Sequence, residues 1–393
     1  MRTRSLGLSL FAGLAVIVSA CGGGGATTAP TSAATAAASE AASQAPASQG
    51  PTSKLRIGVV TDIGTLNDKN FNEYSFKGAE DGAKAIGAPE PHSLVPADQT
   101  AYAADINSFV ALKTDIIVTV GFNLTAATVQ AAHDNPDLWF IGVDQSPICV
   151  TKDGLPDPNF KCEGDAKTLL PHYISLQFQE DQAGYLAGIV AASVDTKGEV
   201  SAIGGTTLCA PCVRYIQGYE LGAKSVKSDI VVSTAYVTND FSAAAFQDQA
   251  GGKVFAENFL AQHPNSDVMF QVAGLTGNGV LDAACAANIH GIGVDVDQFL
   301  SYPAADACLV TSAEKHLEVA VGAAIQAIAA NSATPGDNLY NAKNDGIGIS
   351  DFHDKASLIT ADTQAKIDAA LAAMKAGTLV TCPADSCGVY KAP

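Results

Sequence analysis

Short apolar runs alternate with amphipathic stretches along most of the chain, and this alternation restricts the fold more than any other feature. In the first half, strands are expected at residues 55–60, 115–120 and 139–143, and helices at residues 70–86 and 126–133. The second half repeats the pattern, with strands expected at residues 199–203, 230–236, 268–272 and 291–294 and helices at residues 179–194, 214–225, 243–262 and 277–287. Such alternation predicts an α/β fold with parallel sheets that are covered by helices on both faces.

Polar residues or glycines closely follow six of these strands. They are Asp62, Asn123, Asp144, Gly204, Gly274 and Asp295. Any single aspartate or glycine at such a place more often only ends a strand or caps a helix. In parallel sheets, however, ligands bind beyond the carboxyl ends of the strands. Six strand ends of this kind, in two halves that can face each other, therefore predict a polar cleft between two α/β lobes.

The N-terminus predicts export. Two arginines precede an apolar run, residues 6–20, which is too short to span a bilayer and is typical of a signal peptide at residues 1–20. The run ends in Val-Ser-Ala-Cys, which resembles a bacterial lipobox, so Cys21 is expected to carry lipid. Ordinary secretory cleavage beside a coincidental cysteine is the alternative. Residues 21–53 are expected to form a flexible linker because they cannot build a core. The protein is therefore expected to be exported and lipid-anchored to the cell membrane, facing the outside or the periplasm.

The remaining cysteines fit an exported protein. Besides Cys21 there are eight, an even number that favours disulfides in such a chain. Sequential pairing closes the shortest loops and is preferred here, although eight cysteines allow about 105 connectivities. The preferred pairs are Cys149 with Cys162, Cys209 with Cys212, Cys285 with Cys308, and Cys382 with Cys387.

One pair has a second interpretation. Cys209-Ala210-Pro211-Cys212 has the form of a thioredoxin-like redox motif, which needs a reactive thiolate at a helix N-terminus. Because three other pairs accompany it, a structural role is favoured over redox activity. The cysteines do not have the spacing of a zinc site and no HExxH occurs, so neither a metal nor a cofactor is expected.

The charge of the chain excludes some partners. The formal net charge is −18 at pH 7, and such an acidic surface argues against binding to nucleic acid or to anionic lipid head groups. Hydrophobic residues make up 47% of the chain, which is ample for a core, and the length suits two domains.

Five stretches of the chain resemble successive motifs of one bacterial family. They are IGVVTDIGTLNDKNFNEYSFKGAEDG, FQEDQAGYLAGIVAA, VAGLTGNGV, GVDVDQ and VTSAEKHLEVAV. In this order and spacing they are similar to motifs of the basic membrane protein family, bacterial lipoproteins related to purine nucleoside receptor A. The resemblance runs from about residue 54 to about residue 380. It implies a two-lobed periplasmic-binding fold of type I, each lobe a parallel sheet flanked by helices, with the ligand in the cleft between the lobes.

The resemblance also implies a function. Family members are substrate-binding proteins of ABC transporters, and the best understood ones bind purine nucleosides. The chain is therefore expected to capture a purine nucleoside such as adenosine, guanosine or inosine for ABC permease subunits, without a cofactor and as a monomer. Lobe I is expected at residues 54–175 with a return segment at about residues 297–350, and lobe II at residues 176–296 with the C-terminal segment at about residues 351–393.

The same resemblance assigns ligand contacts to particular residues. Phe71 is expected to stack on the base, a role that suits an aromatic ring in a polar turn. Tyr215 is expected to supply a second ring from the other lobe. Asp144 is expected to accept hydrogen bonds from N–H groups of the base edge. Asp295 and Lys315 are expected to contact the ribose.

The remaining expected contacts come from glycine and from the turn around Phe71. Gly274 is expected to let the backbone approach the sugar closely. Asp62, Asn67, Asp68 and Asn72 are expected to form the polar rim of the turn, and at least one of them only caps the following helix.

Two features depart from the family pattern and leave the ligand open. Residues 148–171 form a lengthened loop near the expected hinge, and Cys209 and Cys212 lie just before the helix of Tyr215, near the expected cleft. The alternative function is the same fold acting as a receptor for a sugar or a signalling molecule. A sugar site would also use aromatic rings, but it would seldom need Asp144 as a reader of a base.

An enzyme is the third interpretation. A nucleoside hydrolase would show an aspartate-rich calcium site near the N-terminus, which residues 61–68 resemble only faintly, and no GxSxG motif occurs. A thiol oxidoreductase would depend on Cys209 and Cys212. The sequence therefore predicts a binding protein and not an enzyme.

Overall fold

The computed structural model describes residues 53–145, 149–159 and 161–391, which belong to one compact unit. The predicted signal peptide, the predicted lipidation site Cys21 and the linker up to residue 52 lie outside the described residues. Within the described ranges, no helix is both long and apolar enough to cross a bilayer.

Six parallel strands form the first sheet, in the order β11-β5-β4-β3-β1-β2. They are β1 (Ile57–Val60), β2 (His92–Leu94), β3 (Ile116–Val120), β4 (Trp139–Val143), β5 (Tyr173–Phe178) and β11 (Gly336–Tyr340). The central strands β1, β3 and β4 are almost wholly buried, as expected where helices cover both faces. Val60 pairs with Thr119 and Val120 with Val143, so these three strands end at one edge of the sheet.

The second sheet has the order β12-β10-β9-β8-β6-β7 and is parallel except for β12, which runs antiparallel to β10. Its strands are β6 (Glu199–Thr206), β7 (Val231–Thr238), β8 (Ser266–Val272), β9 (His290–Asp295), β10 (Leu309–Lys315) and β12 (Ile347–Ile349). Two mainly parallel sheets flanked by helices confirm the predicted α/β fold class.

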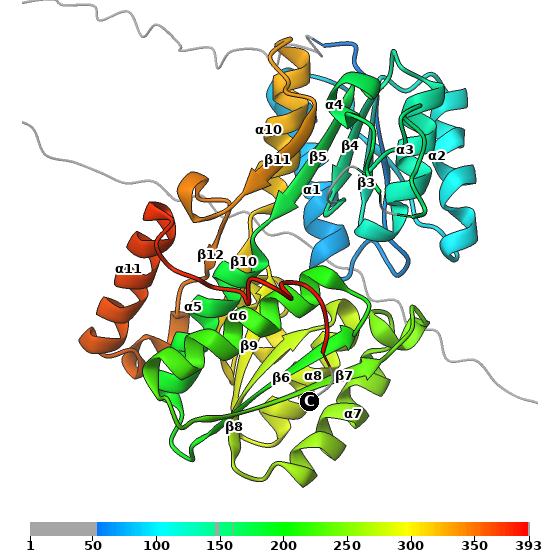
Figure 1. Ribbon diagram of the computed structural model, residues 1–393. Coiled ribbons are helices and arrows are strands. Elements are labelled where there is room, and N and C mark those ends of the chain that lie inside the picture. The colour runs from blue at the N-terminus through cyan, green and yellow to red at the C-terminus, as the bar shows by residue number, and fades with distance from the viewer. Residues whose placement is uncertain (1–52, 146–148, 160, 392–393) are drawn as a thin grey trace, which may run out of the picture. The chain divides into compact units, whose positions relative to one another are not determined.

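Helices cover both faces of each sheet (Figure 1). On the first sheet, α1 (Phe71–Ile86) and α10 (Leu317–Ala329) pack on one face, and α2 (Tyr102–Ala111) and α3 (Thr125–Asp134) on the other. On the second sheet, α5 (Glu180–Val194) and α6 (Ala210–Val226) lie opposite α7 (Gln249–Gln262) and α8 (Gly274–Ala286). The shorter α4 (Ala166–Leu169) and α9 (Gln298–Ser301) lie in connections, and α11 (Ala361–Ala376) packs against α5.

The chain passes between the two sheets three times, after β5, after β10 and after β11. The first and third crossings are joined by a hydrogen bond from the Gln179 N–H to the carbonyl of Tyr340, at 3.0 Å. The second and third crossings are joined by a hydrogen bond from the His316 N–H to the carbonyl of Gly346, at 3.1 Å. The three crossings therefore form one hydrogen-bonded hinge.

The strands divide the chain somewhat differently from the lobe boundaries expected from sequence. The boundary at residue 175 falls inside β5, which continues to Phe178 in the first sheet. The expected return segment, residues 297–350, is shared: α10 and β11 pack with the first sheet, whereas β10 and β12 belong to the second. The physical reason is strand pairing, since β10 hydrogen-bonds β9 along its length and cannot leave that sheet.

The structure joins the eight described cysteines in the four sequential pairs, with each pair of sulfur atoms at bonding distance. Cys149 and Cys162 close a loop within the lengthened segment at residues 148–171, of which residues 148 and 160 are not among the described ones. Cys285 at the end of α8 pairs with Cys308, which directly precedes β10.

Glycines let α5 and α6 touch through their backbones. A Cβ atom at Gly184 or Gly188 of α5 would overlap a backbone carbonyl of α6, and one at Gly218 or Gly222 of α6 would overlap a backbone carbonyl of α5. Contact this close leaves no room for side chains, so the two helices are fixed as a pair. The pair carries Glu180 and Arg214 of the site described below.

Replacement of Gly218 by alanine is expected to lower the free energy of unfolding by about 1–3 kcal/mol, because the added methyl group forces the two helices apart. Chemical denaturation of the purified variant measures the change. Gly348→Ala is the matched control, since a Cβ atom there would meet nothing within 4 Å. Equal stability of the two variants would contradict the packing argument.

Candidate functional site

A cavity lies between the two sheets, with an empty volume of about 730 Å³ including its opening. Nine of the ten residues predicted to contact a ligand line it. They are Asp62, Asp68, Phe71, Asn72, Asp144, Tyr215, Gly274, Asp295 and Lys315. The tenth, Asn67, is exposed and does not line the cavity.

Asp68 and Asn72 brace the turn before α1. The Asp68 carboxylate accepts backbone N–H groups of Asn70, Asn72 and Glu73 at 2.9, 2.9 and 3.1 Å, so it caps the helix in the way expected for at least one residue of this turn. Burial raises the pKa of Asp68 to about 7, although these hydrogen bonds act to lower it. The Asn72 amide donates to the carbonyl of Thr65 at 3.3 Å. Both side chains thus hold the loop that positions Phe71.

Asp62 is also held in place by the protein. It accepts a hydrogen bond from the hydroxyl of Tyr102 and another from the Ile63 N–H at 2.8 Å. Burial raises the pKa of Asp62 above its ordinary value. Gly121, at the end of β3, lies so close that a Cβ atom there would come within 2.6 Å of the Asp62 carboxylate. The carboxylate is therefore fixed at the end of β1 beside the end of β3.

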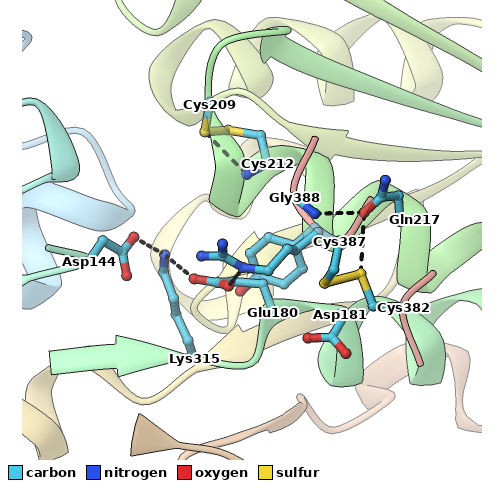
Figure 2. A network of polar contacts seen from close by, with 12 residues as sticks. Asp144, Glu180, Asp181, Cys209, Cys212, Gln217, Lys315, Cys382, Cys387 and Gly388 are labelled. Carbon is cyan, nitrogen blue, oxygen red and sulfur yellow. Dashed lines mark hydrogen bonds and ion pairs between the residues drawn. A yellow bond between two sulfur atoms is a disulfide. The ribbon is translucent and has the colours of Figure 1, made fainter. Parts of the chain in front are cut away.

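Lys315 is the centre of a buried ion cluster (Figure 2). Its side chain is 3% exposed, and its Nζ lies 2.5 Å from Asp144 Oδ2, 3.5 Å from Asp295 Oδ1 and 3.8 Å from Glu180 Oε1. Burial alone would lower the pKa of Lys315, but the three carboxylates raise it above its ordinary value. Lys315 ends β10, directly before the second crossing of the chain, so the ammonium group joins both sheets at the hinge.

The two strand-end aspartates point into this cluster from opposite sheets. Asp144 follows β4 and Asp295 ends β9, and both have left-handed backbone angles, with φ of 57° and 64°. This conformation is uncommon outside glycine but is tolerated by aspartate. Burial raises the pKa of Asp144 to about 6, opposed by the nearby charge of Lys315. Burial likewise raises the pKa of Asp295.

Glu180 and Arg214 belong to the cluster but were missed in the sequence. Glu180 begins α5, its side chain is fully buried, and its Oε2 accepts from Arg214 Nε at 2.6 Å. The feature of the sequence that could have indicated Glu180 is a carboxylate at the first position of an apolar helix that closely follows a strand. Among the described residues, neither Glu180 Oε1 nor Asp144 Oδ1 accepts a hydrogen bond, and both are buried. Buried acceptors of this kind call for a donor.

The aromatic rings are arranged differently from the expectation. Phe71 is half-buried and lies with its ring centroid 4.7 Å from Lys315 Nζ, a cation–π distance. Tyr215 is only 1% exposed, and its hydroxyl donates to Asp295 Oδ1 at 3.2 Å. Its ring packs edge-on against Phe270 in the core. Tyr215 thus touches the cavity while it mainly holds Asp295 in place.

Two other rings, missed in the sequence, line the cavity. They are Phe122, which follows β3, and Phe246, which precedes α7. Phe246 packs closely on Gly205, where a Cβ atom would come within 2.5 Å of the ring. Gly274 begins α8 with a φ of 52°, so the backbone of this helix N-terminus reaches the cavity. The sequence offers little indication that Phe122 and Phe246 line a cavity, because each lies in a short connection between regular elements.

Two hydrogen bonds tie the turn before α1 to the second lobe. The Asn278 amide on α8 donates to the carbonyl of Asp68 at 3.2 Å, and the Ser301 hydroxyl on α9 donates to the carbonyl of Lys69 at 2.8 Å. These bonds and the Lys315 cluster hold the two lobes together around the cavity. Within the described ranges, no three or more His, Cys, Asp or Glu side chains are arranged so that they could hold a metal ion.

The fold and the cavity together define the class of protein. Two lobes with one mainly parallel sheet each, three crossings and a cavity between them form the architecture of solute-binding proteins. A solute-binding protein of an ABC transporter system from Aeropyrum pernix superposes with a TM-score of 0.69 at 21% identity, covering 84% of this chain and 94% of that one. At this identity the likeness concerns the fold alone.

The family follows from the sequence match. Residues 55–379 match the family described as ABC transporter substrate-binding protein PnrA-like, and the chain belongs to this family. An ABC transporter nucleoside-binding protein from Lactococcus lactis is 30% identical over 62% of this chain, a match that spans 64% of that relative, less than two thirds of its length. A CD4+ T-cell-stimulating antigen from Listeria innocua is 24% identical over 93% of this chain and 94% of its own. The predicted family is therefore confirmed, and the protein is an ABC transporter substrate-binding protein rather than an enzyme.

Proposed function

We propose that the protein captures a purine nucleoside and presents it to an ABC permease. One observation carries the proposal: a half-buried aromatic ring, Phe71, and a buried carboxylate oxygen with no hydrogen-bond donor in the described structure, Asp144 Oδ1, line the same interlobe cavity. A purine presents a flat face for the ring and N–H groups at its edge for the oxygen. The relative named as a nucleoside-binding protein supports the same ligand class.

The ribose has its own set of partners under this proposal. Asp295 and Lys315 supply an acceptor and a donor for its hydroxyl groups, and the N-terminus of α8 at Gly274 brings backbone N–H groups to the cavity. Both charged groups are already held by Tyr215 and Glu180. Such pre-ordered groups bind without a further loss of side-chain entropy.

A free sugar is the second candidate, and the cavity favours it less. A sugar would use the aromatic rings and the ribose partners, but it offers no N–H group to Asp144. It would also leave the ring of Phe71 without a planar partner. The family membership does not by itself separate the two ligands, so the choice rests on Phe71 and Asp144.

The proposed setting follows from the exported character of the chain. We infer that Cys21 carries a lipid anchor, that the four cysteine pairs are oxidised outside the cytoplasm, and that the chain works as a monomer with permease subunits. Mass spectrometry of the mature protein from its native membrane tests the lipid and the disulfides together, and unmodified Cys21 in an intact N-terminus would contradict the anchor.

Calorimetric titration of the purified protein tests the ligand. Guanosine, inosine and adenosine are expected to bind with dissociation constants in the micromolar range or below, that is, with about 8 kcal/mol or more of binding free energy. Cytidine is expected to bind more weakly because its single ring stacks over less area. Native mass spectrometry beforehand identifies any ligand retained from purification. Binding of ribose without binding of any purine nucleoside would overturn the proposal.

A further inference from the structure

The wall of the cavity includes a cysteine pair. Cys209, Pro211 and Cys212 all line it, together with Phe71 and Asp144 from the other lobe. Cys209 is the N-cap residue of α6, and its Sγ accepts the N–H of Cys212 at 3.1 Å. Figure 2 shows this pair beside the network of Lys315, Glu180 and Asp144. Both cysteines are almost buried, at 3% and 6% exposure. The sulfur atoms therefore belong to the cavity and not to the outer surface.

Stabilisation of the fold does not account well for this pair. In the chain-entropy model, a disulfide restricts the unfolded chain more when it closes a longer loop. Cys209 and Cys212 are separated by 3 positions, the shortest of the four separations, whereas Cys285 and Cys308 are separated by 23. The pair at the cavity is thus expected to contribute the least to stability. Its position at the cavity wall is the feature that distinguishes it.

The pair faces the part of the cavity around Asp144. Pro211, Phe122 and Asp144 line both this cavity and a neighbouring one that extends toward Cys149. The N-terminus of α6 therefore lies on the Asp144 side. Under the proposed function, Asp144 contacts the base. On this side the second lobe offers the disulfide and Pro211, and Tyr215, one turn further along α6, lines the cavity as well, with its hydroxyl bound to Asp295 and its ring packed on Phe270.

We propose that the Cys209–Cys212 disulfide is the second-lobe surface against which the purine base packs, and that its reduction weakens ligand binding. The inference rests on the proposed function and deepens it. Polarisable sulfur makes favourable contacts with aromatic rings. Under this proposal the disulfide, in the same wall as Tyr215, supplies the second-lobe contact to the base, and Phe71 supplies the contact from the first lobe.

Reduction changes this surface in a defined way. A dithiol reductant transfers two electrons and two protons, so that the S–S bond breaks, Cys209 and Cys212 become thiols, and the reductant becomes a disulfide. The two sulfur atoms must then separate to van der Waals contact, which takes up space in the cavity. The first turn of α6 also loses its cross-link.

The test compares two double variants by calorimetric titration with guanosine and by thermal unfolding. Cys209→Ala with Cys212→Ala is expected to raise the dissociation constant about tenfold, equivalent to about 1.4 kcal/mol, with a melting temperature close to that of the parent. Cys285→Ala with Cys308→Ala is the matched control, since that pair is in the same lobe but does not line the cavity. It is expected to lower the melting temperature and to leave the dissociation constant within about twofold.

Treatment of the unmodified protein with dithiothreitol provides an independent measurement, with alkylation and mass spectrometry to identify the reduced cysteines. The proposal is supported if guanosine binding weakens in proportion to the fraction of protein in which Cys209 and Cys212 are reduced. This measurement also decides the matter if the double variant does not fold. Unchanged affinity in the reduced protein or in the folded double variant overturns it while the proposed function stands. Absence of guanosine, inosine and adenosine binding in the unmodified protein overturns the proposed function and this inference with it.

Discussion

Replacement of Lys315 by methionine is expected to abolish detectable nucleoside binding and to lower the free energy of unfolding by about 3–5 kcal/mol. The lysine is buried among three carboxylates, and methionine keeps the apolar stem while it removes the charge. Asp144, Glu180 and Asp295 would then repel one another, and among the described residues only Arg214 would remain paired with the cluster. Calorimetric titration and chemical denaturation measure the two losses.

Two further variants separate charge from packing. Lys315→Met with Asp144→Asn removes one of the repelling carboxylates, so part of the lost stability is expected to return while binding stays lost. Lys84→Met changes an exposed lysine on α1 and is expected to alter stability by no more than about 0.5 kcal/mol. A Lys315→Met protein as stable as the Lys84→Met protein would refute the role of the ion cluster.

The pH dependence of this contribution has a definite sign. Folding raises the pKa of Lys315, so the protonated lysine stabilises the folded state from neutral pH, above the pKa of about 6 of Asp144, up to the ordinary pKa of lysine. The difference in stability between the parent and Lys315→Met is therefore present in full at neutral pH. It is lost only as the pH rises from the ordinary pKa of lysine through the raised one.

Replacement of Phe71 by alanine is expected to weaken the binding of purine nucleosides by about 1–3 kcal/mol, or roughly 5- to 150-fold, because the base loses its stacking surface. The stability of the fold is expected to change less than in Lys315→Met, since Phe71 is only half-buried at the start of α1. The dissociation constant of guanosine, measured by calorimetry, gives the effect.

The matched controls for Phe71 stay at the same position. Phe71→Tyr keeps an aromatic face and is expected to bind guanosine within a few-fold of the parent. Phe71→Leu keeps much of the apolar volume without the ring and is expected to resemble the alanine variant. Equal affinity of the leucine and tyrosine variants would mean that apolar contact, and not stacking, holds the ligand.

Most of the strands that were expected from sequence are buried, although the buried strand β5 was not among them. Strands β1, β3, β4, β6, β7, β8 and β9 were all expected, because most of them are apolar runs in the interior of a parallel sheet. Strands β2 and β12 were missed because each has three residues. Strand β10 was missed because Thr311, Ser312 and Lys315 interrupt its apolar pattern. Their partners, such as the Ser350 hydroxyl that accepts the Ser312 N–H at 2.8 Å, lie far away in the sequence.

The site residues that could be predicted are those whose position is set by the end of a strand. Asp144 and Asp295 were expected at the cavity because each follows an apolar strand, and both line it. Asn67, which directly precedes Asp68 in the same polar turn, was expected there and is exposed. Periodicity does not reveal which side chains of a turn point inward. Glu180 was missed because its role depends on Arg214 and Lys315, from two other elements.

The sequence by itself determined the family, the α/β class, the two halves and the edge of each sheet where polar groups gather, because these follow from local hydrophobic patterns and ordered motifs. Tertiary structure alone decided which lobe each returning segment joins and that Tyr215, in the cavity wall, donates its hydroxyl to Asp295 and packs its ring on Phe270. It also decided that one lysine neutralises carboxylates from both lobes. These outcomes depend on strand pairing, side-chain packing and electrostatic contacts between residues far apart in the chain, and no local pattern records such distances.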